Sequence, residues 1–335
     1  MKVLLIHSGI DFIGGPYYVT LYCENALKHL GIEVIEIGNP IGRDKVQIDE
    51  DIDRAPEIAA SENPDWILHI HGLAHEGMKG GRILEKLKKS KIPIVLWVQN
   101  DEIDYDETVK ISPLYDLFCC YTRITEKYHR SKGANFMYLP LAADHTTYFP
   151  TILSPSEQIE YSHDLVVIGW KHAERSRLIE ELSKYYKIFC NWNMSLPCEV
   201  VNKIYNASKI MLSIFQDCDN PGSIFNPKSS ILHDKAWGLP CRTFEVPASK
   251  AFQLQEDRVH LKDCYDYRER EVALVPLKNG KTNIDYWKDK IDYYLENVEE
   301  RKSIAELGYK RTIKEHLYIH RMKSIVDKLE IDLQH

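Results

Sequence analysis

The chain has 335 residues and a formal net charge of -7 at pH 7, with 44% hydrophobic and 28% charged residues. This length favours two domains, and the composition is that of a globular protein rather than a disordered one. Charges of both signs are interspersed along the chain, which disfavours a large basic surface for nucleic acid or for an anionic membrane.

Eight cysteines are spread along the chain without a Cys-x-x-Cys pair. Reduced thiols in a cytoplasmic protein explain this spacing better than a disulfide framework or a zinc site. The first apolar run, Lys2–Ile6, is too short for a signal peptide, and no run approaches the ~20 apolar residues of a membrane span. We therefore expect a cytoplasmic location and no membrane span.

The amino-terminal half opens with a strand, a glycine-containing loop and a helix. Val3–Ile6 is a continuous apolar run, as expected for a buried strand, and Gly14 and Gly15 precede the helical pattern of Tyr17–Leu30. These glycines allow the backbone to approach a ligand, although a tight turn explains them equally well. The loop matches neither GxGxxG nor the P-loop, which argues against a nicotinamide site and an ATPase.

Further apolar runs alternate with helical patterns as far as residue 139. The expected strands are Ile32–Ile37, Trp66–Ile70, Pro93–Val98, Leu117–Tyr121 and Asn135–Leu139, and the expected helices are Lys79–Lys89 and Ile124–Lys132. This alternation predicts a doubly wound parallel sheet of the α/β class, in which all strands end at the same edge.

Histidines lie near the end of the strand that begins at Trp66. His69, His71, His75 and Glu76 have the composition of a metal site, because residues two apart on a strand share a face. No second cluster of recognisable spacing completes a ligand set, so we favour a polar lining of the cleft for these residues.

Gln99 and Asp101 follow the strand Pro93–Val98. The carboxylate of Asp101 could accept a proton from a substrate hydroxyl, whereas Gln99 could only hydrogen-bond one. Asp101 could equally cap a helix that begins near Glu102.

A passage from Leu139 to Ser162 contains prolines and serines and has little periodicity, which indicates a linker and a domain boundary at residue 152. A second α/β series follows. Its expected strands are Asp164–Gly169, Lys187–Cys190, Ile210–Ile214, Ala251–Leu254 and Val272–Val275, and its expected helices are Glu174–Lys184 and Glu199–Ala207. From Asp285 to Leu333 the pattern is helical, with interruptions expected at Asn297 and Gly308.

Arg242 and Glu245 lie three residues apart, on one face of a predicted short helix that Ser249 and Lys250 separate from the next strand. The start of a helix favours an anion such as a phosphate, and a carboxylate accepts hydrogen bonds from two sugar hydroxyls. These contacts suit a sugar nucleotide, although a surface ion pair gives the same spacing.

Arg175 and Arg177 follow the first strand of the second series, where a guanidinium group could bind a phosphate. We take Arg177 as the candidate. The pattern places one of the two arginines at the surface.

Four blocks of sequence carry a resemblance to a known family. They are the Gly14-Gly15 loop, the passage Leu139-Pro140…Asp144…Phe149-Pro150, the block Gly238-Leu239-Pro240…Arg242-Thr243-Phe244-Glu245…Ala251-Phe252-Gln253-Leu254, and the tail Asn297…Glu300-Arg301…Gly308…His316…Tyr318…His320-Arg321. On these blocks the chain resembles the GT-B glycosyltransferases, and more specifically the CgeB-like, spore-maturation type with a C-terminal domain like that of the group 1 glycosyl transferases.

The resemblance implies two Rossmann-like domains that face a central cleft. Residues 1–152 would form the acceptor side, residues 153–315 the nucleotide-sugar donor side, and residues 316–335 a helix that packs back on the first domain. Glu245 matches the acidic residue that holds the nucleotide ribose, and Arg242 matches the arginine beside it. Trp237 and Gln99 stand where many relatives have a glutamate and a histidine.

The resemblance further implies transfer of a hexose-type sugar from a nucleoside diphosphate sugar, with retention and without a metal or other cofactor. The acceptor is unidentified: a glycan, a protein, a small molecule or, with least support, a nucleic acid. A nucleotide-sugar epimerase of similar fold and a non-catalytic nucleotide-sugar-binding protein are the alternatives. The expected site residues are Asp101, His71 and Gln99 for catalysis, Arg177, Arg242, Glu245, Ser249 and Lys250 for the donor, and Gly14 and Gly15 for an acceptor or phosphate loop.

Overall fold

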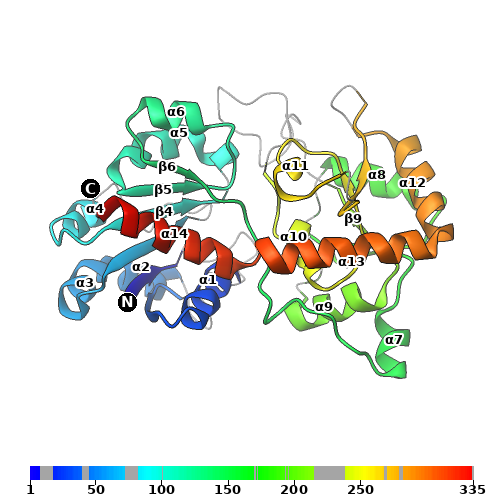
Figure 1. Cartoon of the computed structure of the whole chain (residues 1–335), viewed down its shortest axis with the longest axis horizontal. Helices are drawn as coiled ribbons and strands as arrows, with labels where there is room; N and C mark the ends of the chain where they lie inside the picture. Colours follow the sequence, from blue (N-terminus) through cyan, green and yellow to red (C-terminus); the bar gives the residue numbers. More distant parts are fainter. Residues whose placement is uncertain are drawn as a thin grey trace. The chain divides into compact units, whose positions relative to one another are not determined.

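The structure is a computed structural model that divides into two compact units (Figure 1). Of the described residues, the first unit comprises those in 1–140 and 318–333, and the second comprises those in 141–317. The structure describes residues 1–7, 18–39, 45–71, 82–99, 101–169, 171, 173–192, 194, 196–214, 238–267, 270–278 and 282–333.

The first unit is built on a parallel sheet with strand order β2-β1-β3-β4-β5-β6 among its described residues. The strands are β1 Lys2–Ile6, β2 Glu33–Ile37, β3 Trp66–His71, β4 Ile94–Val98, β5 Leu117–Cys120 and β6 Phe136–Tyr138. Leu4 pairs with Ile35 of β2 on one side and with Ile67 of β3 on the other. β4 and β5 are buried along their whole length, as expected for central strands covered by helices on both faces.

Helices cover this sheet, and the last helix of the chain is one of them. They are α1 Tyr18–His29, α2 Lys45–Asp53, α3 Ala55–Glu62, α4 Arg82–Lys88, α5 Asp101–Ile111, α6 Glu126–Ser131 and α14 Tyr318–Leu333. α14 lies beside α1 (Figure 1), and the ring of Tyr318 is 5.5 Å from that of Tyr22 and 6.0 Å from that of Trp97. The expected return of the C-terminal helix to the first domain is confirmed.

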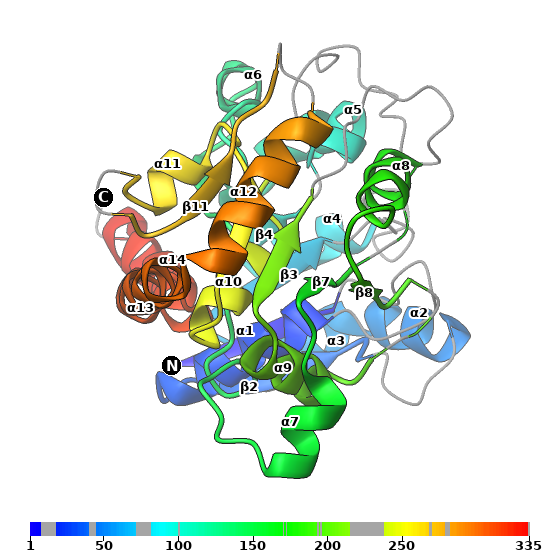
Figure 2. The same ribbon diagram turned by 90° about the vertical axis from the view of Figure 1, so that its right-hand side faces the viewer.

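The second unit is built on a parallel sheet with strand order β11-β10-β9-β7-β8 among its described residues. The strands are β7 Leu165–Val167, β8 Ile188–Cys190, β9 Ile210–Ser213, β10 Gln253–Glu256 and β11 Ala273–Val275. The helices are α7 Pro155–Tyr161, α8 Ala173–Leu182, α9 Cys198–Ala207, α10 Arg242–Ala248, α11 Leu261–Cys264, α12 Ile284–Glu296 and α13 Val298–Glu315. α8 and α12 contact each other (Figure 2), and Leu182, Trp287 and Ile291 are buried where they meet the strands. The prediction of two doubly wound parallel α/β domains is confirmed.

The passage around residue 155, which the sequence indicated to be an irregular linker, contains helix α7. The hydroxyl of Ser154 accepts a hydrogen bond from the amide of Glu157, and the carboxylate of Glu157 accepts one from the amide of Ser154 at 2.9 Å. This capping box, with Pro155 in the first turn, starts a helix without an apolar stripe. Caps rather than periodicity therefore identify α7.

Residues 141–152 belong to the second unit, whereas the sequence suggested the first. Two asparagine side chains of α9 hold this passage: the amide of Phe149 donates to Asn202 at 3.3 Å, and the amide of Thr151 donates to Asn206 at 2.7 Å. The carbonyl of Phe149 also accepts hydrogen bonds from both asparagines. These side-chain contacts leave no pattern in the linker sequence itself.

Of the two interruptions expected in the C-terminal helical region, one is right and one is wrong. Asn297 separates α12 from α13, but Gly308 lies inside α13, and the next break comes at His316. A Cβ at Gly308 would lie 2.7 Å from the carbonyl oxygen of Glu271. Gly308 therefore allows close packing rather than ending a helix. No helix in the described part of the chain is long and apolar enough to cross a bilayer.

Candidate functional site

The sheet of the second unit reverses its winding direction between β7 and β9. β8 lies on one side of β7, whereas β9, β10 and β11 follow on the other side. Open parallel sheets bind their ligands beside the carboxyl ends of the strands at such a reversal. Gly169 follows β7 and Ile214 follows β9, so these two positions mark the candidate site.

Two arginine side chains meet at this point. Nε of Arg175 donates to the carbonyl of Ile214 at 2.9 Å, and Nη2 of Arg242 donates to the same carbonyl at 3.3 Å. Only 3% of Arg175 is exposed. Burial lowers the pKa of both guanidinium groups, and the like charge of Arg242 lowers the pKa of Arg175 further. Two guanidinium groups that meet at one carbonyl favour an anion with several oxygen atoms.

Gly169 leaves the space that these guanidinium groups occupy. Its φ is +132°, and its amide donates to the side chain of Asn191 at 2.8 Å. A Cβ at this position would lie 3.0 Å from Nη1 of Arg242 and 3.2 Å from Nη1 of Arg175. A side chain here would be strained by its φ and would press on both arginines, so glycine is the residue that fits.

Glu245 lies one turn after Arg242 on α10 and is 8% exposed. Burial raises the pKa of its carboxyl group to about 8, Arg242 opposes this shift, and the charge of Asp144 adds to it. The hydroxyl of Tyr205 is also buried and has no hydrogen-bond partner within the described part of the chain. Burial, with the charge of Glu245, raises the pKa of this hydroxyl well above its ordinary value. The two groups offer polar contacts to a ligand that carries hydroxyls.

A further charged pair lies at the carboxyl end of β10, the strand next to β9: Glu256 ends the strand and Arg258 follows it. The carboxylate of Glu256 accepts a hydrogen bond from the guanidinium group of Arg258 at 2.5 Å, and both residues are at most 4% exposed. Glu256 also acts on the pKa of Arg175 and Arg242 as an opposite charge. Several charged side chains, among them the buried Arg175, Glu256 and Arg258, therefore lie at the carboxyl edge of this sheet.

Of the two arginines of α8, Arg175 and not the predicted Arg177 donates to the carbonyl of Ile214. Arg177 is exposed, whereas Arg175 is buried together with Leu178, Ile179 and Leu182. Arg175 stands three, four and seven positions before those apolar residues, which is the spacing of one helix face. That spacing is the sequence signal that could have identified Arg175.

Ser249 and Lys250 also need correction as phosphate ligands. They follow the carboxyl end of α10, and their amides donate to carbonyls of that helix instead of standing at a helix start. The hydroxyl of Ser249 donates to Asn202 at 2.7 Å, and the ammonium group of Lys250 pairs with Glu306 at 2.5 Å. Both side chains have structural partners within their own unit.

Asp101, the predicted catalytic base, is fully buried in the first unit, and both of its carboxylate oxygens have partners there. One carboxylate oxygen accepts from the hydroxyl of Thr108, and the other lies 3.0 Å from Nε2 of His129. Nδ1 of His129 lies 2.8 Å from the hydroxyl of Ser112. All four residues are 0% exposed. This chain of hydrogen bonds links α5, α6 and the turn at Ser112, so we assign Asp101 a structural role.

The remaining predicted residues of the first unit stand at strand ends or outside the described residues. Gln99 follows β4 and is buried, and His71 ends β3, although its side chain is not described. Nδ1 of His69 lies 3.2 Å from the hydroxyl of Tyr115. The described residues contain no group of three or more His, Cys, Asp or Glu side chains that could hold a metal ion. The predicted positions Gly14, Gly15, His75, Glu76 and Trp237 lie outside the described residues.

Comparison with known proteins identifies the family of the chain. Residues 140–327 match a family model described as glycosyl transferase-like. The chain belongs to this glycosyltransferase family. It is also 22% identical over 338 residues to the spore protein CgeB of Bacillus subtilis strain 168, an alignment that covers 93% of this chain and 94% of CgeB.

Solved glycosyltransferase structures share the fold of this family member. Sucrose-phosphate synthase from Thermosynechococcus elongatus matches with a TM-score of 0.62 at 12% identity, over 98% of this chain and 99% of that one. A glycosyltransferase from Rickettsia africae matches with a TM-score of 0.62 at 11% identity, over 100% and 99%. HepE from Anabaena, in complex with UDP and glucose, matches with a TM-score of 0.61 at 9% identity, over 98% and 99%. The fold is therefore GT-B, with two Rossmann-like domains.

Proposed function

We propose that this glycosyltransferase takes a hexose-type sugar from a nucleoside diphosphate sugar and transfers it to an acceptor. The observation that carries the proposal is the pair of guanidinium groups, Arg175 and Arg242, that meet at the carbonyl of Ile214. A nucleoside diphosphate has the several anionic oxygen atoms that such a pair can bind through charge-assisted hydrogen bonds.

The same pair can lower the barrier to transfer. When the bond between the sugar and the diphosphate breaks, negative charge grows on the departing phosphate oxygen. Fixed cations beside that oxygen stabilise the transition state more than the ground state, which is the requirement for catalysis. We therefore assign Arg175 and Arg242 to the binding of the diphosphate. Gly169 has no side chain and so leaves room for both guanidinium groups beside its backbone.

Glu245 is assigned to the ribose of the nucleotide. It follows Arg242 by one turn of α10, and a carboxylate can accept hydrogen bonds from two neighbouring hydroxyls. HepE, whose fold is similar, has been solved with UDP and with UDP-glucose. Uridine nucleotides are therefore the first donors to test on this chain.

Retention of configuration at the transferred carbon and independence from metal are part of the proposal. Retention rests on the family resemblance. Metal independence is supported by the two guanidinium groups, which supply the positive charge that a divalent ion would otherwise bring to the diphosphate. The acceptor would be bound mainly by the first unit, and its chemistry is open among a glycan, a protein and a small molecule.

A thermal-shift screen of nucleotide sugars, followed by a turnover assay, tests the proposal. A ligand at a hundred times its Kd adds about 2.7 kcal/mol to the free energy of unfolding. We expect a nucleoside diphosphate sugar to stabilise the protein and to be consumed when an acceptor is present. An epimerase would instead yield an epimerised sugar without acceptor, and a binding protein would be stabilised but would turn nothing over.

Metal independence has its own measurement. Turnover should be unchanged after dialysis against EDTA, because no step of the proposal needs a divalent ion. Activity that is lost on dialysis and restored by one divalent ion would contradict this part and would direct attention to His69, His71 and His75 as ligands.

A further inference from the structure

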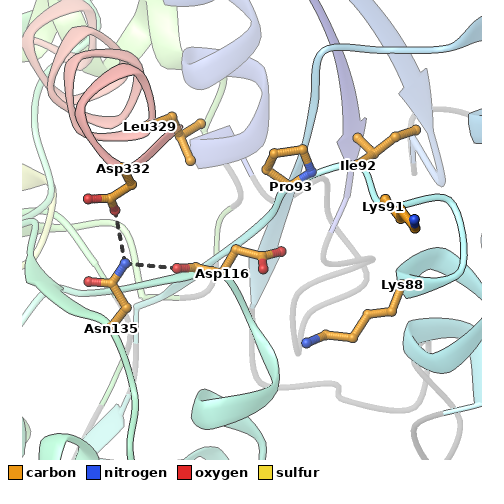
Figure 3. Close-up of a pocket in the computed structure, with 8 residues that line it drawn as sticks. All are labelled: Lys88, Lys91, Ile92, Pro93, Asp116, Asn135, Leu329 and Asp332. Atoms are coloured by element: carbon orange, nitrogen blue, oxygen red, sulfur yellow. Dashed lines mark hydrogen bonds between the residues drawn. The ribbon is translucent and has the colours of Figure 1, made fainter. Parts of the chain in front are cut away.

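A pocket of about 530 Å³ lies on the first unit, at the edge of its sheet where the strands begin. Pro93 and Asp116 immediately precede β4 and β5, and Leu329 and Asp332 belong to the last turns of α14 (Figure 3). The volume is within the range of small-molecule sites. Parallel sheets bind their substrates at the opposite edge, where the strands end, so this pocket is separate from that edge of its sheet.

Two lysines line the pocket, and their ammonium groups have no ion-pair partner among the described residues. Lys88 ends α4 and its side chain extends across the pocket toward Asp116, and Lys91 follows in the next turn (Figure 3). Both are exposed, and neither ammonium group has a hydrogen bond or an ion pair within the described part of the chain. The backbone of Lys91 is in the left-handed region, with φ +59°.

Each of the two carboxylates of the pocket has a hydrogen-bond partner, but one oxygen of Asp116 remains available within the described part of the chain. Asp332 accepts a hydrogen bond from the side-chain amide of Asn135 at 3.0 Å and another from Lys328. Oδ2 of Asp116 accepts a hydrogen bond from the amide of Ile94 at 2.8 Å. The second oxygen of Asp116 has no hydrogen bond among the described residues. A ligand therefore meets two free cations and one acceptor oxygen.

Apolar side chains complete the pocket. Ile92 and Pro93 line it between the lysines and α14, and Leu329 lines it from α14 (Figure 3). The apolar face of a sugar ring can pack against such a surface while its hydroxyls donate to an acceptor. A phosphate or carboxylate on the ring can at the same time bind two ammonium groups.

We propose that this pocket binds a small anionic sugar, with its phosphate or carboxylate group at Lys88 and Lys91 and a ring hydroxyl at Asp116. The inference is independent of the donor site, because every residue that lines the pocket belongs to the first unit. A ligand in the pocket would contact α14 and the residues that precede β4 and β5 at the same time.

Calorimetric titration with glucose 6-phosphate, glucuronate, glucose and inorganic phosphate tests the proposal. At least one of the two anionic sugars should bind at least ~10-fold more tightly than glucose or phosphate alone, and the comparison of the two decides between a phosphate and a carboxylate. Hydrogen exchange of the backbone amides, measured with the tighter-binding sugar, should slow in segments 88–94 and 325–333.

The double variant Lys88→Gln/Lys91→Asn should lose at least ~10-fold in affinity for that sugar, since each ammonium group offers a charge-assisted hydrogen bond. Asparagine is chosen at residue 91 because it tolerates a positive φ.

Lys89→Gln is the matched control, because Lys89 is an exposed neighbour that does not line the pocket. It should bind the anionic sugar as the wild type does. Asp116→Asn keeps an acceptor for the amide of Ile94, and it should weaken binding of the sugar but not of inorganic phosphate. Equal affinity of the Lys88→Gln/Lys91→Asn variant and the wild type would overturn the proposal, as would exchange protection confined to the second unit. Failure of the protein to bind nucleotide sugars would leave these results unchanged.

Discussion

Glu245 couples the protonation of the site to the stability of the fold. Burial raises its pKa from an ordinary value of 4.5 to about 8. Between these two values the folded protein holds a proton that the unfolded chain has released, so stability falls as the pH rises through this window. At pH 7 the carboxyl group of the free protein is mostly protonated, whereas hydrogen bonds from ribose hydroxyls favour the ionised form.

We predict that Glu245→Gln removes this pH-dependent loss of stability. Its Tm should fall less than that of the wild type between pH 5 and pH 8, as measured by thermal melts across the range, because Gln has no proton to hold. The variant should also bind the donor nucleotide more weakly by about tenfold, since a neutral amide accepts weaker hydrogen bonds than a carboxylate.

Glu299→Gln serves as a control for this prediction, because Glu299 is exposed on α13. It should follow the wild type in both measurements. A Glu245→Gln variant that melts in parallel with the wild type at every pH would show that the Glu245 carboxyl titrates near its ordinary value.

Asp101 is predicted to act on stability rather than on rate. Asp101→Asn changes a buried carboxylate that lies between Thr108 and His129, so the free energy of unfolding should fall by about 1–3 kcal/mol. The value of kcat in the folded protein should stay near that of the wild type. Denaturant unfolding and steady-state kinetics check the two parts separately.

Glu107→Gln, at an exposed position of the same helix α5, is the comparison variant and should change neither quantity. A loss of ~100-fold in kcat with an unchanged free energy of unfolding would restore Asp101 as a catalytic residue, since general acid–base groups contribute at least this much.

At the scale of elements, buried strands and helix α7 are identified by different sequence signals. The central strands β4 and β5 are buried runs of apolar residues, and such runs can be identified from the sequence without knowledge of their neighbours. α7 lacks a buried residue and is identified by its capping box instead. The break between α13 and α14 at His316 has no glycine or proline to mark it.

Gly308 shows why a glycine alone is an ambiguous signal. In an exposed helix, Gly→Ala usually adds up to about 1 kcal/mol of stability. In α13 the new Cβ would lie 2.7 Å from the carbonyl oxygen of Glu271, which is backbone and cannot move aside cheaply. We therefore predict that Gly308→Ala lowers the Tm, as measured by calorimetry.

Ser303→Ala, on the exposed face of the same helix, isolates the contribution of helix propensity. It should leave the Tm unchanged or raise it slightly. If Gly308→Ala were as stable as Ser303→Ala, the close contact between α13 and Glu271 would not exist as described.

At the scale of the whole molecule, the parts of the chain that the structure describes form two parallel sheets, which reverse their winding direction between β1 and β3 and between β7 and β9. The alternation of strands and helices was sufficient to predict both sheets. The sequence also placed Arg242 and Glu245 on one short helix, and both lie on α10. It did not predict Arg175, because the choice between Arg175 and Arg177 depends on which face of α8 meets the sheet. The sequence suggested Asp101 as a catalytic base or a helix cap and did not reveal its buried hydrogen bonds, because the partners Thr108 and His129 come from later positions in the chain.

The most direct measurement of the donor site is calorimetric titration of UDP, GDP and ADP into the wild type and three arginine variants. Arg175→Gln and Arg242→Gln should each weaken the tightest of these ligands by at least ~10-fold, because a charge-assisted hydrogen bond contributes about 1.5–3 kcal/mol. Arg177→Gln is the matched control two positions away on α8, where the side chain is exposed, and it should bind as the wild type does. Equal affinity of all three variants and the wild type, in proteins that remain folded, would contradict the assignment of Arg175 and Arg242 to the diphosphate.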